Sequence, residues 1–338
     1  MGQAAVIGAG SWGTALAKLL SEKGHAVRIW SYEASVAEQI RERRVNEIYL
    51  PGIEVPASVE VFTEHADALE GAEIVIAVVP SHAFREVMQA AAPLVPRDAI
   101  MVSATKGIEV DTLNRPSEIL AKLSPDQAPP AVLSGPTFAR EVAEGDPTAI
   151  AVASRDSDVA RQAQHFLNTE RFRVYTNEDV LGVELAGALK NVIALAAGIA
   201  DGLGYRSNSR AALITRGLAE ITRLGLAMGA RASTFAGLAG LGDLVLTCSS
   251  DLSRNRTVGV RLGRGETLEE ILASMRMVAE GVRTTKAARQ LARAYNVEMP
   301  IVEEVHHILF EGKSPKRATA DLMLRSPKPE LWGGTDAT

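Results

Sequence analysis

The sequence predicts an α/β fold in which an N-terminal doubly wound sheet precedes an all-α C-terminal domain. Short apolar runs alternate with helical patterns up to residue 178, which is typical of βαβ units and a mostly parallel sheet. From Glu178 onward strand patterns stop, and the chain continues as helical segments broken at glycines. We therefore expect a sheet domain over residues 1–178 and a helical domain over residues 179–338.

The composition agrees with a globular protein of two domains. The 338 residues are 46% hydrophobic and 23% charged, which is long enough for two cores and too apolar for a disordered chain. The formal net charge of -5 argues against a nucleic-acid-binding protein, and no apolar stretch predicts stable membrane insertion. Cys248 is the single cysteine, so we expect no disulfide framework and a reducing, cytoplasmic location.

The first expected strand leads into a G-x-G-x-x-G motif formed by Gly8, Gly10 and Gly13, and a helical pattern follows. In this setting Gly8 lets the chain turn, Gly10 lets backbone amides approach a diphosphate, and Gly13 lets the helix lie close to the sheet. Ser11 and Trp12 stand at the start of that helix, where an anion is favoured. The motif predicts a Rossmann-type domain that binds NAD(P).

The residues after the second expected strand leave the choice of cofactor open. An NAD-binding domain usually ends this strand with an acidic residue that holds the ribose, but Ser31 stands there. Glu33 lies two residues later and can take that role. A cofactor 2′-phosphate would instead need cations, which are available nearby at Arg28, Arg41, Arg43 and Arg44. On balance we expect NADPH, with NADH as the alternative.

Further strands are expected at 73–79, 99–103, 131–133, 148–153 and 172–175. Ligands of doubly wound sheets bind at the carboxyl ends of the strands. One such end carries Lys106, and the next leads through Gly135 and Thr137 into a helix near Ala139. A solvated lysine in a loop explains the position of Lys106 equally well.

Lys190 is the strongest candidate for catalysis in the helical domain, whose first helix we expect Asn177 to cap. Helical spacing places Lys190 on one stripe with small residues such as Ala194 and Gly198. Partial desolvation there would lower the pKa of the lysine towards the working pH and suit a general acid. The alternative is a lysine that extends from the edge of the helix into water.

A second polar group is expected further along this domain. Residues 237–242 are rich in glycine and predict a tight helical corner that positions Asp243. Ser253 then precedes Arg254 and Asn255 at the start of another helix, an arrangement that favours a phosphate. A basic, solvated helix is the alternative. The six histidines show no spacing typical of metal ligands, so we expect no metal.

Taken together, these stretches closely resemble bacterial NAD(P)-dependent glycerol-3-phosphate dehydrogenase over nearly the whole chain. The resemblance implies reduction of dihydroxyacetone phosphate to sn-glycerol 3-phosphate for phospholipid synthesis, by a cytoplasmic homodimer. The matching stretches are GAGSWGTALA, ATKGIE, LSGPTFAREV, ELAGALKNVIALAAGIADGLG, GLAGLGDLVLTC, SRNR and AEGVRTT.

The resemblance also implies roles for individual residues. Lys190 is implied as the catalytic proton donor and acceptor, supported by Asp243, with Thr247 as a weaker candidate and Lys106 adding positive charge. Residues implied to contact the nucleotide are Ser11, Trp12, Lys106, Ala139, Arg254, Val278 and Glu280. Residues implied to contact the substrate are Lys106, Gly135, Thr137, Lys190, Asp243, Ser253, Arg254 and Asn255.

Two other functions fit part of this pattern. A related dehydrogenase of a 3-hydroxy acid would share the two domains and an active-site lysine, but the SRNR stretch favours a phosphorylated substrate. A protein that senses NADPH without turnover would need no catalytic group, and Lys190 with Asp243 argues against it.

Overall fold

A central sheet of eight strands, in the order β10-β9-β8-β7-β6-β1-β2-β5, organises the N-terminal part of the chain. Neighbouring strands are parallel except for β8 and β9, which pair antiparallel. The sheet is therefore mixed, because β9 and β10 run opposite to the other six. Its strands are β1 (Gln3–Ile7), β2 (Ala26–Trp30), β5 (Val59–Phe62), β6 (Ile74–Ala77), β7 (Ile100–Ser103), β8 (Ala131–Ser134), β9 (Thr148–Ala153) and β10 (Phe172–Asn177).

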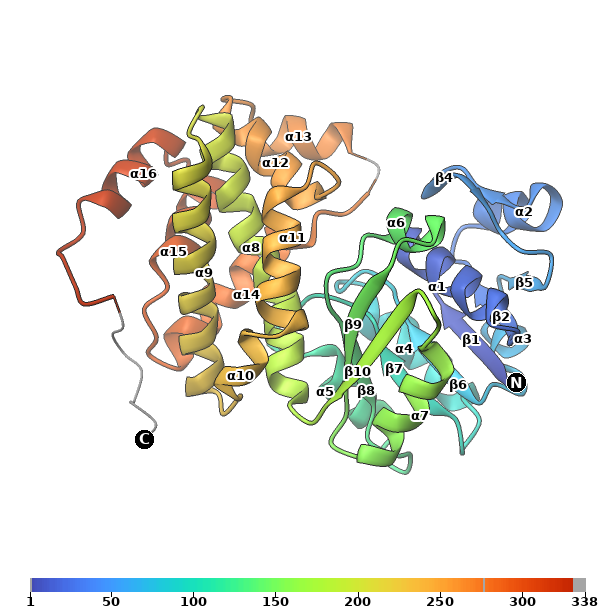
Figure 1. Cartoon of the computed structure of the whole chain (residues 1–338). Coiled ribbons are helices and arrows are strands. Elements are labelled where there is room, and N and C mark those ends of the chain that lie inside the picture. Colours follow the sequence, from blue (N-terminus) through green and yellow to red (C-terminus); the bar gives the residue numbers. More distant parts are fainter. Residues whose placement is uncertain (1, 276, 331–338) are drawn as a thin grey trace. The chain divides into compact units, whose positions relative to one another are not determined.

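The computed structural model describes residues 2–275 and 277–330. It divides into two compact units (Figure 1). The first comprises Met1–Glu109 with Asn114–Glu184, and the second Val110–Leu113 with Leu185–Thr338. The division falls within one helix, close to the boundary expected after residue 178.

Helices cover both faces of the sheet in the first unit. Side chains of β1 alternate between two apolar clusters, since Val6 packs with α1, α2 and α7 while Ile7 packs with α3, α4 and α5. This alternation confirms the predicted doubly wound arrangement. The helices are α1 (Ser11–Glu22), α2 (Ala34–Arg43), α3 (His65–Leu69), α4 (Phe84–Ala91), α5 (Pro116–Leu123), α6 (Ala139–Glu144) and α7 (Ser157–Leu167).

A small hairpin of β3 (Val45–Asn46) and β4 (Leu50–Glu54) follows α2 and was not predicted from the sequence. Its strands are antiparallel and too short to show an apolar periodicity. Tyr49 lies in the turn between the two strands. The hairpin contacts the glycine loop through Asn46 and Tyr49.

The described residues of the second unit form helices and no strand, as predicted. Ser253 caps its helix, and Thr267 forms a capping box with Glu270. The helices are α8 (Val180–Gly202), α9 (Ser207–Ala227), α10 (Ala232–Phe235), α11 (Asp243–Ser249), α12 (Arg254–Gly263), α13 (Leu268–Ser274), α14 (Glu280–Ala294), α15 (Pro300–Phe310) and α16 (Pro315–Met323).

Helix α8 supplies much of the core of the second unit. It is long and apolar enough for a membrane span, but 94% of its most apolar window is buried within the fold. The Ala232–Ser249 stretch passes the same length and hydropathy test and contains a π-helical turn at Leu238–Gly242. The expected cap of α8 is wrong by two residues: the carboxylate of Asp179, not the amide of Asn177, accepts from the N–H of Gly182.

Candidate active site

The glycine loop joins β1 to α1 and leaves open space at one of its three glycines. Gly8 has φ +123°, which only glycine adopts readily, and a Cβ on Gly13 would overlap the carbonyl oxygen of Gly8. Gly10 has an ordinary φ of -72°, and a Cβ there would meet nothing within 4 Å. The fold thus requires glycine at the first and third positions, while the second leaves room for a ligand. This is the geometry that the glycine motif predicts where a dinucleotide diphosphate would approach the N-terminus of α1.

Asn46 braces this loop, and sequence reasoning missed it. Its fully buried amide donates to the carbonyl oxygen of Ala9 and to Oγ1 of Thr14, both at 2.8 Å. Its side-chain oxygen accepts from the N–H of Tyr49 at 3.1 Å. Through these three hydrogen bonds Asn46 fixes the conformation of the glycine loop. A lone asparagine after a helix gives no sequence signal for such a role, because the contact depends on the tertiary fold.

Trp12 and Ala139, both predicted nucleotide contacts, lie against the same small apolar cluster of the first unit. The indole Nε1 of Trp12 is buried and has no hydrogen-bond partner. A buried donor without a partner costs free energy, which favours a functional role for the Trp12 indole next to the glycine loop. The hydroxyl of Ser11 donates to the carbonyl oxygen of Tyr49 at 2.6 Å, which ties the start of α1 to the hairpin segment.

Lys106, Gly135 and Thr137 also come together within the first unit. The ammonium of Lys106, in the loop after β7, donates to the carbonyl oxygen of Gly135 at 2.9 Å. The hydroxyl of Thr137 donates to the same oxygen at 3.1 Å. Lys106 is only half-buried, so its charge lies at the surface of this unit, at the carboxyl end of a strand.

Lys190 is buried and paired in the second unit, which excludes the alternative of a lysine extending into water. Its ammonium donates to the carboxylate of Asp243 and, at 2.8 Å, to Oγ1 of Thr247. Thr247 in turn donates to the carbonyl oxygen of Asp243 at 2.6 Å. Asp243 is the first residue of α11, directly after the π-helical turn, so the predicted glycine-rich corner does position it. The pair provides an ammonium with a fixed direction in a nearly dry setting.

Small residues of α8, among them Gly198 of the predicted stripe, allow another helix to approach. Gly198 and Gly202 of α8 face Gly259 and Gly263 of α12 so closely that a Cβ on any of them would overlap a carbonyl oxygen of the other helix. We call these four residues the glycine contact. It holds α12, and the Arg254 at its start, against the helix that carries Lys190.

Polar side chains reinforce the same arrangement at the start of α12. The amide of Asn255 donates to Oδ1 of Asn191 at 2.9 Å and accepts from the N–H of Gly281 at 2.9 Å. Ser253 uses its hydroxyl to accept from the N–H of Arg256 at 3.2 Å. The predicted phosphate site is therefore a capped helix N-terminus that hydrogen bonds connect to both α8 and α14.

Arg254, the first residue of α12, is exposed, whereas Glu280, the first residue of α14, and the preceding Val278 are half-buried. Desolvation lowers the pKa of the Arg254 guanidinium, while the negative charge of Glu280 opposes that shift. The only cysteine, Cys248, is buried next to Thr247 along α11, and burial raises the pKa of its thiol to about 12. A thiol with that pKa remains protonated and behaves as a small apolar side chain.

Three of the four arginines expected to meet a cofactor 2′-phosphate, Arg28, Arg41 and Arg44, have protein partners. Arg28 donates to the carboxylate of Glu70 and to the carbonyl oxygen of Asp67, both at 2.8 Å. Arg41 and Arg44, like the exposed Arg43, lie at the C-terminal end of α2. Arg41 and Arg44 donate to the carbonyl oxygens of Val61 and Val59.

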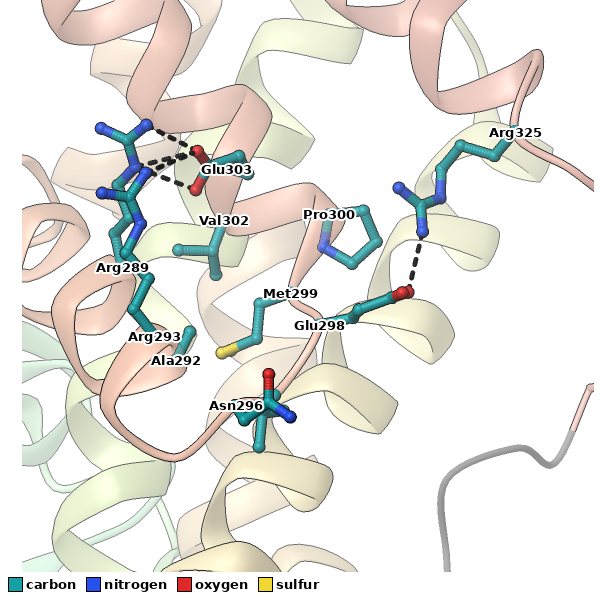
Figure 2. A pocket seen from close by; sticks show the side chains of 11 residues that line it. Arg289, Ala292, Arg293, Asn296, Glu298, Met299, Pro300, Val302, Glu303 and Arg325 are labelled. Carbon is teal, nitrogen blue, oxygen red and sulfur yellow. Dashed lines mark hydrogen bonds and ion pairs between the residues drawn. The ribbon is translucent and has the colours of Figure 1, made fainter.

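A cavity of about 310 Å³ lies in the second unit, lined by residues of α14, α15 and the segment between them, and by Arg325 (Figure 2). Its charges are paired with one another: Arg289 and Arg293 donate to Glu303, and Arg325 donates to Glu298. None of the predicted site residues lines it. Among the described residues, no group of three or more His, Cys, Asp or Glu side chains is placed to hold a metal ion.

Comparison with known proteins identifies the family. The family model for the N-terminus of NAD-dependent glycerol-3-phosphate dehydrogenase matches residues 3–160, and the model for its C-terminus matches residues 179–320. The chain belongs to this family. A glycerol-3-phosphate dehydrogenase [NAD(P)+] of Citrifermentans bemidjiense is 56% identical over 328 residues, which cover 96% of this chain and 98% of that protein.

Solved structures agree with the family assignment. The crystal structure of glycerol-3-phosphate dehydrogenase from Coxiella burnetii superposes with a TM-score of 0.92 at 42% identity, covering 96% of this chain and 99% of that one. A ketopantoate reductase from Ralstonia eutropha shares only the fold, with a TM-score of 0.60 at 15% identity. The chain is therefore an NAD(P)-dependent oxidoreductase of the glycerol-3-phosphate dehydrogenase family, as the motifs predicted.

Proposed function

We propose that the chain interconverts dihydroxyacetone phosphate and sn-glycerol 3-phosphate, with Lys190 as the proton donor and acceptor. The pairing of Lys190 with Asp243 and Thr247 supports this role, because it fixes a buried ammonium in one direction. The bound NAD(P)H supplies a hydride to C2 of the substrate. As charge develops on the C2 oxygen, Lys190 donates a proton to it, and in the reverse direction accepts the proton from the hydroxyl.

The substrate phosphate binds, in this proposal, at the start of α12. Ser253 caps that helix and leaves its N-terminal end favourable to an anion, and Arg254 adds a guanidinium able to form two parallel hydrogen bonds. Asn255, Gly135 and Thr137 complete the substrate contacts. Binding energy from the phosphate, which does not react, helps to orient the carbonyl group for the chemical step.

The first domain, residues 1–178, holds the cofactor, and the domain of residues 179–338 supplies the catalytic group. The open space at Gly10 supports this assignment, together with the contacts of Ser11, Trp12 and Ala139. Residues proposed to reach the cofactor from the rest of the chain are Lys106, Arg254, Val278 and Glu280. Lys106 also adds positive charge near the substrate.

The choice between NADPH, which the sequence favours, and NADH is the finer part of this proposal. The expectation of NADPH depends on arginines that bind protein groups in the structure or lie at the far end of α2. The carboxyl end of β2, where the adenosine ribose of a Rossmann domain lies, therefore determines the choice. A homodimer in the cytoplasm that supplies phospholipid synthesis completes the proposal.

One assay tests the reaction directly. The absorbance of NADH, and separately of NADPH, is followed with the purified chain in the presence and absence of dihydroxyacetone phosphate. Loss of absorbance that requires the phosphorylated ketone supports the proposal. A chain that binds reduced cofactor but consumes none with this substrate would instead behave as the non-catalytic sensor considered above.

A further inference from the structure

The segment after β2 lies next to the glycine loop. Trp30, the last residue of β2, pairs with Ile7, the last residue of β1, and its carbonyl oxygen accepts from the N–H of Gly8 at 3.1 Å. The next residues therefore leave the sheet at the edge where a dinucleotide extends its adenosine. Glu33 lies there, at the N-cap position of α2, in an extended conformation.

Tyr49 holds the side chain of Glu33. The phenol of Tyr49 donates to the carboxylate at 2.6 Å, and this contact raises the pKa of Tyr49 to about 12. The tyrosine thus stays protonated and remains a donor. Its backbone is fixed in turn, since its N–H donates to Asn46 and its carbonyl oxygen accepts from Ser11. A chain of hydrogen bonds therefore connects the glycine loop to Glu33.

No cation offsets this carboxylate in the two segments that leave the sheet here. Residues 31–35 and 63–66 contain Glu33 and Glu64 as their only acidic or basic residues other than a histidine. That histidine, His65, is stacked on Trp30 with ring centroids 4.2 Å apart, and burial lowers its pKa. It is therefore neutral at neutral pH.

The arginines at the C-terminal end of α2 lie too far from Glu33 to neutralise its carboxylate. Arg41 is in the last turn of this ten-residue helix, so it lies roughly 12 Å along the axis from Glu33. Arg28 reaches the C-terminal end of α3, where Glu70 accepts from it. A 2′-phosphate would thus meet a fixed negative charge, whereas two ribose hydroxyls would meet a good acceptor.

We propose that Glu33, held in place by Tyr49, accepts hydrogen bonds from the adenosine ribose and rejects a 2′-phosphate, so that the chain prefers NADH to NADPH. This inference rests on the proposed function, because it concerns the cofactor of the same reaction. It also reverses the expectation of NADPH. Glu33 is the residue that selects the cofactor, and Tyr49 is a positioning residue.

Binding without turnover is the first test. Adenosine 5′-monophosphate and adenosine 2′,5′-bisphosphate differ only in the 2′-phosphate, and each is titrated into the chain by calorimetry, with NADH and NADPH followed by fluorescence. We expect the 2′-phosphorylated member of each pair to bind at least roughly tenfold more weakly, since repulsion of a dianion by a carboxylate costs that much even in water. Equal or tighter binding of the 2′-phosphorylated members would overturn the inference.

Three variants assign the effect to Glu33. Glu33→Gln keeps the shape but removes the charge, and the preference for NADH should fall by about tenfold, mostly through tighter NADPH binding. Tyr49→Phe frees the carboxylate and should weaken NADH binding several-fold without strengthening NADPH binding to the level of the glutamine variant. Glu38→Gln removes one charge from an exposed position on the same helix and should leave the preference unchanged.

The outcomes separate this inference from the proposed reaction. Turnover of dihydroxyacetone phosphate with NADPH at least as efficient as with NADH would overturn the cofactor choice and leave the reaction intact. Absence of turnover with either cofactor, together with the expected binding preference, would contradict the reaction and support Glu33. A preference equal in wild type and Glu33→Gln would overturn the role of Glu33, even if NADH is preferred.

Discussion

The ammonium of Lys190 on α8 and the carboxylate of Asp243 on α11 form an ion pair, although 53 residues separate them along the chain. Both side chains are almost fully buried. Such a pair contributes little net stability, but loss of one partner leaves an uncompensated charge in the interior. The catalytic role proposed for Lys190 and the stability of the fold therefore depend on the same pair, and the variants below are designed to separate the two effects.

Replacing Lys190 with Met should lower kcat by at least about a hundredfold, because the substrate oxygen loses its proton donor. NAD(P)H should bind nearly as before, since the glycine loop holds it. Stopped-flow or steady-state turnover, with cofactor binding followed by fluorescence, checks both parts. Near-normal turnover would remove Lys190 from the mechanism.

The same variant should unfold more easily, by roughly 3–5 kcal/mol, because the buried carboxylate of Asp243 loses the ammonium that compensates its charge. Adding Asp243→Asn to Lys190→Met removes that charge and should restore much of the lost stability in urea titrations. It should restore no activity. Recovery of turnover in the double variant would show that the single variant was inactive only through misfolding.

Replacing Gly10 with Val should abolish cofactor binding while the chain stays folded. The new side chain meets no protein atom within 4 Å at its Cβ, so it fills the space left for the diphosphate. Gly13→Ala is the matched comparison: its Cβ would overlap the carbonyl oxygen of Gly8, so it should lower the free energy of unfolding by at least about 1–3 kcal/mol. Circular dichroism and fluorescence titration of NADH distinguish the two effects.

Replacing Arg254 with Ala should lower kcat/KM for dihydroxyacetone phosphate by about thirty- to a thousandfold, equivalent to roughly 2–4 kcal/mol. The variant loses a charge-assisted contact to the phosphate. Lys at this position restores the charge without the two parallel hydrogen bonds, so it should recover only part of the rate.

Unphosphorylated dihydroxyacetone, which we expect both enzymes to convert poorly, is the control for Arg254. It lacks the phosphate, so the alanine variant should convert it almost as well as the wild type does. An equal fold loss on both substrates would mean that Arg254 acts on the cofactor or the fold.

Glu220 should make the stability of the second unit depend on pH. Its carboxylate accepts from the N–H groups of Ile301 and Val302 at the start of α15, and burial raises its pKa from 4.5 to about 7. Between these values the folded chain binds more protons than the unfolded chain, so stability falls as pH rises from about 5 to 7. The loss should approach roughly 3 kcal/mol.

Glu220→Gln cannot titrate and isolates this effect from that of the histidines. Urea unfolding of both proteins at pH 5 and pH 8 should show the wild type losing more stability than the variant over that range. The same loss in both proteins would assign the pH dependence to other groups.

Local sequence signals predicted the elements that carry the site. The glycine motif and the serine at position 253 each act within a few residues, so pattern and chemistry agree there. The sequence also indicated a stripe of small residues on the helix of Lys190. It did not show that α12 packs against this helix, because the partner lies some sixty residues further along the chain.

Contacts between distant segments account for what the sequence missed. The role of Asn46 depends on a contact between the hairpin and the glycine loop, which no local sequence pattern predicts. The antiparallel pairing of β9 with β8 follows from the connection after β8, because the apolar pattern of a strand does not show its direction. Arg41, Arg43 and Arg44 follow β2 closely in the sequence. They lie at the C-terminal end of α2, a placement that proximity in sequence did not show.

The glycine contact between α8 and α12 limits how this enzyme can evolve. Where two helices meet through side chains, one substitution can be compensated by another, and the spacing drifts over time. Here the main chains themselves touch, so the separation between Lys190 and the start of α12 is near the smallest that two helices allow. Substrates of different length cannot be accommodated by moving these helices together, and new specificities must arise in the loops around them.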